Sequence, residues 1–219
     1  MTSPGGSAMR LAGRGSRIVV LFLLAGALAA TGCGRMPGIV VLSDPLSAEE
    51  HLALGVAYER KGETDLAIRE YERALRKGGE SFRARVNLGN ALLAKTEYGK
   101  ARDEYRKALA IRPGDPEAAN NLAWTAVLSG EGLGEAEGLM EEVVSREGNR
   151  TATFLDTLGV VRMRLGRTSA AQEALNDAES ACLRGGEAAC SGEVLGEIRR
   201  HQRELRDRIH PPPRGSLVE

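Results

Sequence analysis

Apolar and small residues recur along this chain in blocks that suit helices and repeat every 34 residues. The first block contains Leu54–Tyr58, followed by Ala67, Tyr71 and Ala74. Adding 34 gives a second block, and two further copies follow, with a shift of one residue after Gly130. The matching positions of the later copies are Leu88, Gly89, Ala101, Tyr105, Ala108, Leu122, Ala123, Ala136, Met140, Leu158, Gly159, Ala171, Leu175 and Ala178. A fixed period of this length predicts a protein built of repeated helix pairs.

Local residues indicate where the helices begin and turn. The segment Ser47–Glu50 is a capping box, in which the serine and glutamate side chains each accept a hydrogen bond from a backbone amide. Glycine stands in three expected turns, "RKGET", "LSGEG" and "RLGRT", and Pro113 ends the second helix of repeat two. Residues 191–209 predict a polar-faced terminal helix. Its expected inward-facing residues are Val194, Leu195, Ile198, Leu205 and Ile209.

The repeats resemble the tetratricopeptide repeat, specifically in the first two copies and more loosely in the others. The tryptophan that opens the family pattern is absent from all four copies. The resemblance implies an all-α fold, a right-handed α-solenoid of four helix pairs plus a C-terminal capping helix. The expected segments are the solenoid 48–185 (48–81, 82–115, 116–151 and 152–185), the capping helix 186–210 and a disordered tail 211–219.

Packing explains the repeated residue types. The small residues Gly55 and Gly89, with their counterparts on the second helices, let the two helices of a pair approach closely. We expect Tyr58, Tyr71 and Tyr105 to fill the space between neighbouring pairs. Because one pair cannot bury its apolar face alone, stacking of the pairs supplies a continuous core.

The N-terminal segment 1–32 has the pattern of a signal peptide. It carries Arg10, Arg14 and Arg17 and no acidic residue, and then an apolar run of 13 residues, Ile18–Ala30. As a helix this run would span about 20 Å, which is short of the roughly 30 Å of a membrane core. It therefore suits the apolar region of a signal peptide better than a membrane span. Translation could begin at Met1 or at Met9.

The sequence around Cys33 resembles the bacterial lipobox, in which small residues precede a lipidated cysteine. Ala30–Cys33 reads Ala-Thr-Gly-Cys. The resemblance implies a lipid anchor on Cys33 and a tether over 33–46. It also implies attachment to the bacterial cell envelope, at the outer membrane facing the periplasm, since Gly34 is not aspartate. The alternative is an ordinary cleaved signal with an incidental cysteine. The apolar residues 39–42, Ile-Val-Val-Leu, either belong to the tether or dock as an extended segment on the domain behind it.

Charge and side-chain chemistry exclude several classes of function. Residues 1–32 hold three of the 30 basic residues, so 27 Lys and Arg face 30 Asp and Glu in the rest of the chain, a net charge of −3. This balance does not suit nucleic-acid binding. The three histidines, His51, His201 and His210, lie far apart without metal-ligand spacing. We predict no enzymatic activity, no cofactor and no metal site, and we interpret His51 as a helix-packing residue.

Two further cysteines lie near the predicted cap. Cys182 falls at the end of the last repeat helix and Cys190 precedes the capping helix. An oxidising periplasm would allow a structural disulfide that closes the loop between them. The alternative is two buried thiols.

The resemblance places the binding surface in a concave groove lined by the first helix of each pair. Counting from Ala48, Phe82, Pro116 and Ala152 assigns these residues to it: Arg60, Arg83, Asn87, Asn90, Glu117, Asn120, Asn121, Trp124, Asp156 and Arg164. Asn90 and Asn121 match two asparagines that grip a peptide in chaperone-binding relatives. The basic residues of that clamp are replaced by Thr153 and Thr157, so the clamp is only half present. The alternative is that the amides brace neighbouring helices.

These observations predict an envelope lipoprotein that acts as an adaptor or scaffold for a protein or peptide partner. The hypothesis places Trp124 with Arg83, Asn87, Asn90 and Asn121 at the centre of the groove, because tryptophan and arginine dominate binding hot spots. The alternative for Trp124 is packing against repeat four. We expect a monomer or part of an envelope complex, with membrane contact through Cys33. A different class remains open, a structural or pilot and assembly subunit of a secretin, pilus or cell-wall-remodelling complex.

Overall fold

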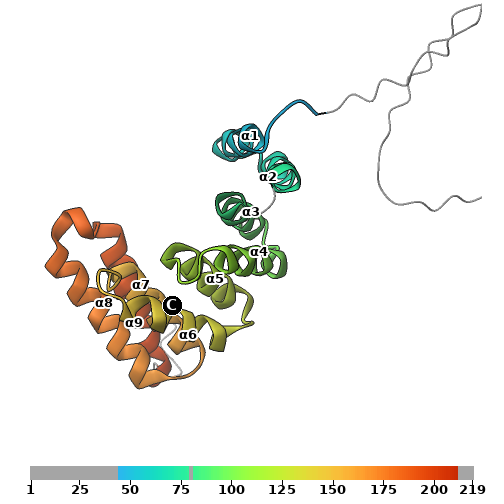
Figure 1. Ribbon diagram of the computed structural model, residues 1–219. Coiled ribbons are helices and arrows are strands. Elements are labelled where there is room, and N and C mark those ends of the chain that lie inside the picture. The colour runs from blue at the N-terminus through green and yellow to red at the C-terminus, as the bar shows by residue number, and fades with distance from the viewer. Residues whose placement is uncertain (1–43, 79–80, 212–219) are drawn as a thin grey trace, which may run out of the picture. The chain divides into compact units, whose positions relative to one another are not determined.

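The computed structural model describes residues 44–78 and 81–211, and these residues form helices and turns without a strand (Figure 1). The predicted signal peptide and Cys33 lie outside the described residues. The helices are α1 (Ala48–Arg60), α2 (Thr64–Gly78), α3 (Phe82–Ala94), α4 (Tyr98–Ile111), α5 (Pro116–Ser129), α6 (Leu133–Ser145), α7 (Ala152–Arg164), α8 (Thr168–Ala189) and α9 (Gly192–Ile209).

The helices stack as pairs in chain order. α1 packs on α2, α3 on α4, α5 on α6 and α7 on α8, and each second helix also contacts the first helix of the next pair. Figure 1 shows this succession from α1 to α8, with α9 at its end. The backbones of neighbouring odd-numbered helices approach each other closely, whereas the even-numbered helices of the described region lie further apart and meet through long side chains. The expected all-α solenoid of helix pairs with a terminal helix is confirmed.

A side-chain cap fixes the start of every odd-numbered helix. Ser47 and Glu50 form the predicted capping box at α1. The other caps are Ser81, Asp115, Thr151 and Ser191, each of which accepts a hydrogen bond from the amide three residues further on. These caps satisfy amides that have no partner inside a helix, and they set the helix starts at 48, 82, 116 and 152.

The turn inside each pair contains a residue with left-handed backbone. Gly62, Gly130 and Gly166 have φ of +76°, +76° and +74°. The α5–α6 turn has a second such glycine, Gly132, which accommodates the extra residue of repeat three. In the α3–α4 turn the position is taken by Thr96 at φ +59°, the one described non-glycine residue with positive φ.

Close contact within a pair depends on glycine facing a large side chain. A Cβ atom at Gly55 would lie 2.4 Å from Tyr71 Cε1, and one at Gly89 would lie 2.6 Å from Tyr105 Cε1. Both tyrosines are fully buried. Each ring lies across the glycine of its own pair, and both rings belong to the core that this pair shares with its neighbour.

The buried residues form two clusters. The first core lies around Tyr71, Tyr105 and Leu122, and the second lies around Met140, Leu175 and Ile198. Leu109 and Leu139 are partly buried and pack against both clusters. Each repeat therefore contributes to a core that it shares with its neighbours, as expected for a solenoid.

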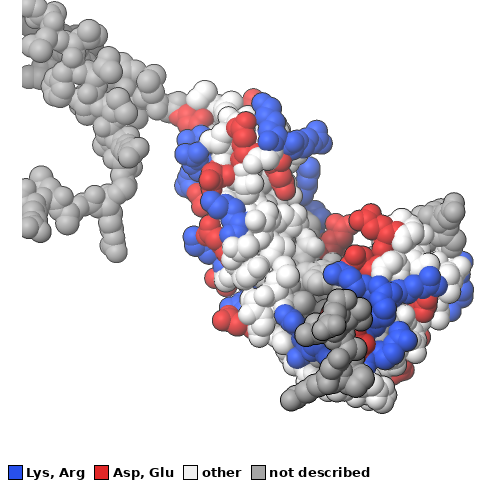
Figure 2. Space-filling model, turned by 180° about the vertical axis from the view of Figure 1, so that it is seen from behind, with Lys and Arg blue, Asp and Glu red and all other residues white. Residues whose placement is uncertain are grey.

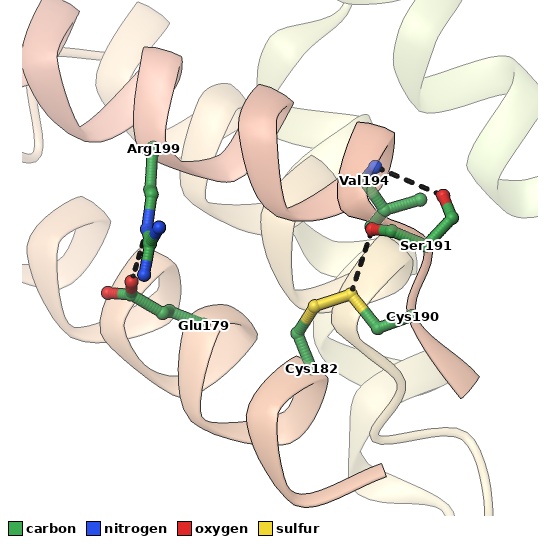
Figure 3. The surroundings of a disulfide bond; sticks show 6 residues. All are labelled: Glu179, Cys182, Cys190, Ser191, Val194 and Arg199. Carbon is green, nitrogen blue, oxygen red and sulfur yellow. Dashed lines mark hydrogen bonds and ion pairs between the residues drawn. A yellow bond between two sulfur atoms is a disulfide. The ribbon is translucent and has the colours of Figure 1, made fainter. Parts of the chain in front are cut away.

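The C-terminal end is closed by α9 and a disulfide between Cys182 and Cys190 (Figure 3). Arg199 Nε donates to Glu179 Oε1 over 2.9 Å and joins α9 to α8. Two expectations are corrected here. The segment between the cysteines is not a loop, since α8 continues to Ala189. Ile209, expected to face inward, is 42% exposed and is the last residue of α9.

Candidate binding surface

The candidate surface is the face on which α1, α3, α5 and α7 contact one another, here called the odd-helix face. It is the face that the sequence assigns to the groove. Capped helix starts and the glycine contacts hold these helices in register. The surface therefore rests on rigid helices rather than on loops, which suits a binding surface that must present several side chains together.

Asn90 and Asn121 meet across the contact between α3 and α5. Asn121 Nδ2 donates to Asn90 Oδ1 over 3.0 Å, and the Tyr105 hydroxyl donates to the same oxygen over 2.7 Å. These bonds join neighbouring helices, which is the bracing arrangement that the sequence left open. Among the described residues, Asn90 Nδ2 and Asn121 Oδ1 have no hydrogen-bond partner, and both residues are half-buried. The bonds of this pair therefore leave one amide donor and one carbonyl acceptor unused.

Asn87 and Arg83 lie on α3, one and two turns before Asn90 along the same side of the helix. Asn87 is half-buried and Arg83 is exposed. Tyr71 lies near Asn87, and its hydroxyl donates to Glu59 Oε2 over 2.6 Å. Burial, followed by the Glu59 carboxylate, raises the pKa of the Tyr71 hydroxyl, so it remains a donor at neutral pH.

Trp124 is half-buried and lies between α5 and the terminal helix. Its ring centroid is 6.2 Å from that of His201 on α9, with the rings tilted by 45°. His201 is buried, and its Nδ1 lies 2.8 Å from Asp156 Oδ1 on α7. Asp156, expected to line the groove, is itself buried and holds α9 in place. Trp124 therefore contacts α9 and also keeps an exposed part.

Sequence reasoning missed His201 as a structural residue. It stands three residues after Ile198 and four before Leu205, the two most buried apolar residues of α9, so its spacing places it on the same face. A buried histidine needs a polar partner, and Asp156 supplies one. His51, by contrast, is buried as predicted, with Nδ1 2.7 Å from Glu70 Oε2.

The odd-helix face continues to an exposed apolar residue. Leu128 is 51% exposed and follows Asn121 and Trp124 by seven and four residues, so the three lie along one side of α5. Arg164 of α7 donates to the carbonyl oxygen of Val127 over 2.8 Å, which places the end of α5 against α7. Figure 2, from behind the view of Figure 1, shows an uncharged area over the middle of the described part, with charged side chains on either side of it.

Ion pairs cross the other side of the solenoid. Arg106 on α4 donates from Nε and Nη2 to the two carboxylate oxygens of Glu135 on α6, over 2.9 and 2.5 Å. Arg102 Nη1 lies 3.0 Å from Glu131 Oε2. The hydrogen bonds from Arg106 lower the pKa of the Glu135 carboxyl. Between α2 and α4 a cleft of about 650 Å³ remains, floored by Leu88 and Leu92.

No group of three or more His, Cys, Asp or Glu in the described part of the chain is arranged to hold a metal ion. In the same residues no helix combines the length and apolar character needed to cross a membrane.

Comparison with known proteins identifies the repeat type. Residues 43–116 match the tetratricopeptide repeat family. The chain contains tetratricopeptide repeats. The curated proteins contain no match to it. Tetratricopeptide repeats are in general interaction modules without catalytic activity, and this repeat fold is that of a protein-interaction scaffold.

Solved structures share the tetratricopeptide repeat fold over most of the described chain. MamA from residue 41 onward, of Desulfovibrio magneticus, is 16% identical with a TM-score of 0.56, covering 75% of this chain and 97% of that one. A thermophilic tetratricopeptide repeat protein of Thermus thermophilus is 22% identical with a TM-score of 0.56, covering 75% and 84%. A tetratricopeptide repeat protein of Parabacteroides merdae is 15% identical with a TM-score of 0.60, covering 74% and 61%.

Proposed function

We propose that this protein is a lipid-anchored adaptor of the bacterial envelope, which binds a peptide or helix of a partner protein on its odd-helix face. The observation that carries the binding role is the arrangement around Asn90 and Asn121. A donor and an acceptor there lie between the half-exposed Trp124 and the exposed Arg83. An extended peptide presents a carbonyl and an amide on one edge, and these two groups can pair with both.

Apolar contact would supply most of the affinity. Trp124 and Leu128 lie on the same side of α5, and tryptophan is enriched among residues that dominate binding energy. The polar pair then fixes the direction of the bound segment. This division between apolar anchors and a few oriented polar groups is usual in protein recognition.

The envelope location is supported by two observations that are independent of the binding surface. The first is the sequence of residues 1–33, with its basic start, short apolar run and Ala-Thr-Gly-Cys. The second is the disulfide between Cys182 and Cys190, since structural disulfides persist in oxidising compartments such as the periplasm. A lipid on Cys33 would confine the adaptor to a membrane surface and so raise its effective concentration for partners there.

The binding role is tested by crosslinked capture from native membranes. Leu128→Glu places a charge on the odd-helix face, while Leu183→Glu places the same charge on an equally exposed leucine of α8 as a matched control. We expect capture of a partner by the wild type and by Leu183→Glu, and its loss in Leu128→Glu. Equal capture by both variants would exclude the odd-helix face as the binding surface.

The anchor is tested separately by labelling cells with a fatty acid that carries a chemical tag. The wild-type protein should become labelled and sediment with membranes, and Cys33→Ser should do neither. A labelled Cys33→Ser protein would contradict the anchor but not the binding role.

The form in which a partner is recovered also separates an adaptor from a structural subunit, because a subunit stays in a fixed-ratio complex throughout purification.

A further inference from the structure

One side of α1 has no helix of the described region packed against it (Figure 1). α3 packs against α2, and α5 packs against α4, so each later first helix is covered by the second helix of the preceding pair. Among the described residues no helix precedes α1. The corresponding side of α1 is here called the α1 edge and consists of Glu50, Leu54, Ala57, Tyr58 and Lys61.

The second pair shows how this side of a first helix is used inside the stack. The residues of α3 that correspond to Glu50, Leu54, Ala57 and Tyr58 are 0%, 5%, 1% and 6% exposed, in the order Ala84, Leu88, Ala91 and Leu92. On α1 the leucine and the tyrosine are only half-buried, and the alanine is exposed. The ends of a solenoid need a polar or covered surface to remain soluble. The α1 edge is apolar in its middle, so it calls for a cover.

The two ends of the α1 edge carry opposite charges. Glu50 and Lys61 are both exposed, and they are about 16 Å apart at 1.5 Å per residue along the helix. Glu50 accepts from the Ser47 amide through Oε2, which leaves its other carboxylate oxygen available. Lys61 directly follows α1 and keeps helical backbone, with φ −88° and ψ −2°. The α1 edge is therefore acidic at its start, apolar in its middle and basic at its end.

A second copy of α1, turned end for end, matches this pattern. Positions 50, 54, 57 and 61 are spaced alternately by four and three residues, which is the spacing of the contact line between two helices of a coiled coil. In an antiparallel pair, the register that places Glu50 opposite Lys61 of the other copy also places Leu54 opposite Ala57. Opposite charges then meet at both ends, and each large apolar side chain faces a small one.

The symmetry of such a pair repeats every contact. A two-fold axis between the helices makes the surface self-complementary, so both charge pairs and both Leu54–Ala57 contacts occur twice. Tyr58 of the two copies would lie on the same flank of the contact, beside the leucines. A parallel pair would instead place Glu50 against Glu50 and Lys61 against Lys61, which is unfavourable.

We propose that two copies of this protein associate through their α1 edges as an antiparallel pair with two-fold symmetry. This goes beyond the proposed function, because the pairing needs neither a lipid nor a partner. It also uses a different side of α1 from the odd-helix face, so each copy keeps its own binding surface. One helix pair is a small contact, and the dimer is therefore expected to dissociate readily. Confinement to a membrane surface would favour it.

The first test is sedimentation equilibrium of the full-length chain carrying Cys33→Ser, in a mild detergent. We expect this reference chain to dimerise with a dissociation constant of roughly 1–100 µM. Lys61→Glu turns two attractive charge pairs into two repulsive ones and should raise the dissociation constant at least about tenfold. Arg60→Glu makes the same charge change at the end of α1 but off the edge, and it should have little effect. A reference chain that is monomeric at about 1 mM, or equal effects of the two variants, would overturn the proposal.

The second test is disulfide trapping, which reports the direction of the pairing. Chains with Glu50→Cys are mixed with chains with Lys61→Cys, each also carrying Cys33→Ser and the native disulfide. In the antiparallel pair these two positions face each other, whereas the two copies of position 61 are about 16 Å apart along the helix. Mixed dimers should therefore form at least about tenfold faster than dimers of Lys61→Cys chains alone. Equal rates, or faster linking of Lys61→Cys chains to themselves, would show another mode of association and overturn the proposal.

Discussion

The contact between Gly89 and Tyr105 makes a sharp prediction for Gly89→Ala. A Cβ atom there would lie 2.6 Å from Tyr105 Cε1 and 2.9 Å from both Cδ1 and Cζ. The ring cannot swing away freely, because it is fully buried and its hydroxyl donates to Asn90 Oδ1 over 2.7 Å. Burial also raises the pKa of this hydroxyl, so the donor proton stays in place.

The expected effect of Gly89→Ala combines three contributions. Overpacking of a core costs about 1–3 kcal/mol. Displacing the ring weakens a buried hydrogen bond that contributes about 1 kcal/mol. Alanine regains about 1 kcal/mol through its higher helix propensity. We therefore expect a loss of roughly 1–3 kcal/mol in the free energy of unfolding. The control is Gly138→Ala in α6, where a Cβ meets no atom within 4 Å. That change should stabilise by about 0.5–1 kcal/mol.

Repeat three suggests a second substitution that would make room for the alanine of Gly89→Ala. It has Ala123 where repeat two has Gly89, and Met140 where repeat two has Tyr105, and both are fully buried. In urea unfolding followed by circular dichroism, Gly89→Ala and Tyr105→Met should each destabilise. The loss in the free energy of unfolding of the double variant should be smaller than the sum of the two single losses by at least about 1 kcal/mol. If the two effects simply add, or if Gly89→Ala is as favourable as the Gly138 control, the steric reasoning is refuted.

Three other changes test separate features. Thr96→Gly should raise the urea midpoint, with a gain of about 0.5–1 kcal/mol, because a threonine at φ +59° is strained; Thr96→Ala should not. Cys182→Ser should destabilise by about 2–3 kcal/mol, and reductant should destabilise the wild type similarly while leaving this variant unchanged. Arg106→Gln should raise the pKa of Glu135 in an NMR titration. Pairing with Arg106 depresses the pKa of Glu135 below its ordinary value near 4.5. The contribution of this pair to the free energy of unfolding is therefore present above pH 4.5 and is lost as the pH falls through the folded-state pKa.

The repeat architecture was accessible from sequence because it rests on local and periodic signals. Ser47 and Glu50 mark the first helix through a capping box that needs only four residues. The 34-residue period gives the starts of α3 and α5, and α7 follows α5 after 36 residues because repeat three is longer. The glycines of the turns give most of the ends of these helices. Such signals act within a helix or between neighbours in the chain, so no tertiary information is needed to find them.

Contacts between distant residues could not be placed in this way. The sequence shows that Tyr105 and Gly89 repeat together, but not that the tyrosine ring lies directly across this glycine. Nor does the sequence show that Asp156 is buried against His201, 45 residues later, instead of lining the groove. The same residue type serves as a surface carboxylate or a buried partner, and only the packing of α9 decides between them. The lipid anchor on Cys33 stays a prediction.

The two cores meet through Leu109 and Leu139, which pack against both. Because both leucines pack against both cores, the stability of one half of the stack is coupled to that of the other. A change in packing at one end, such as a bound partner would cause, would therefore alter the stability of the repeats at the other end.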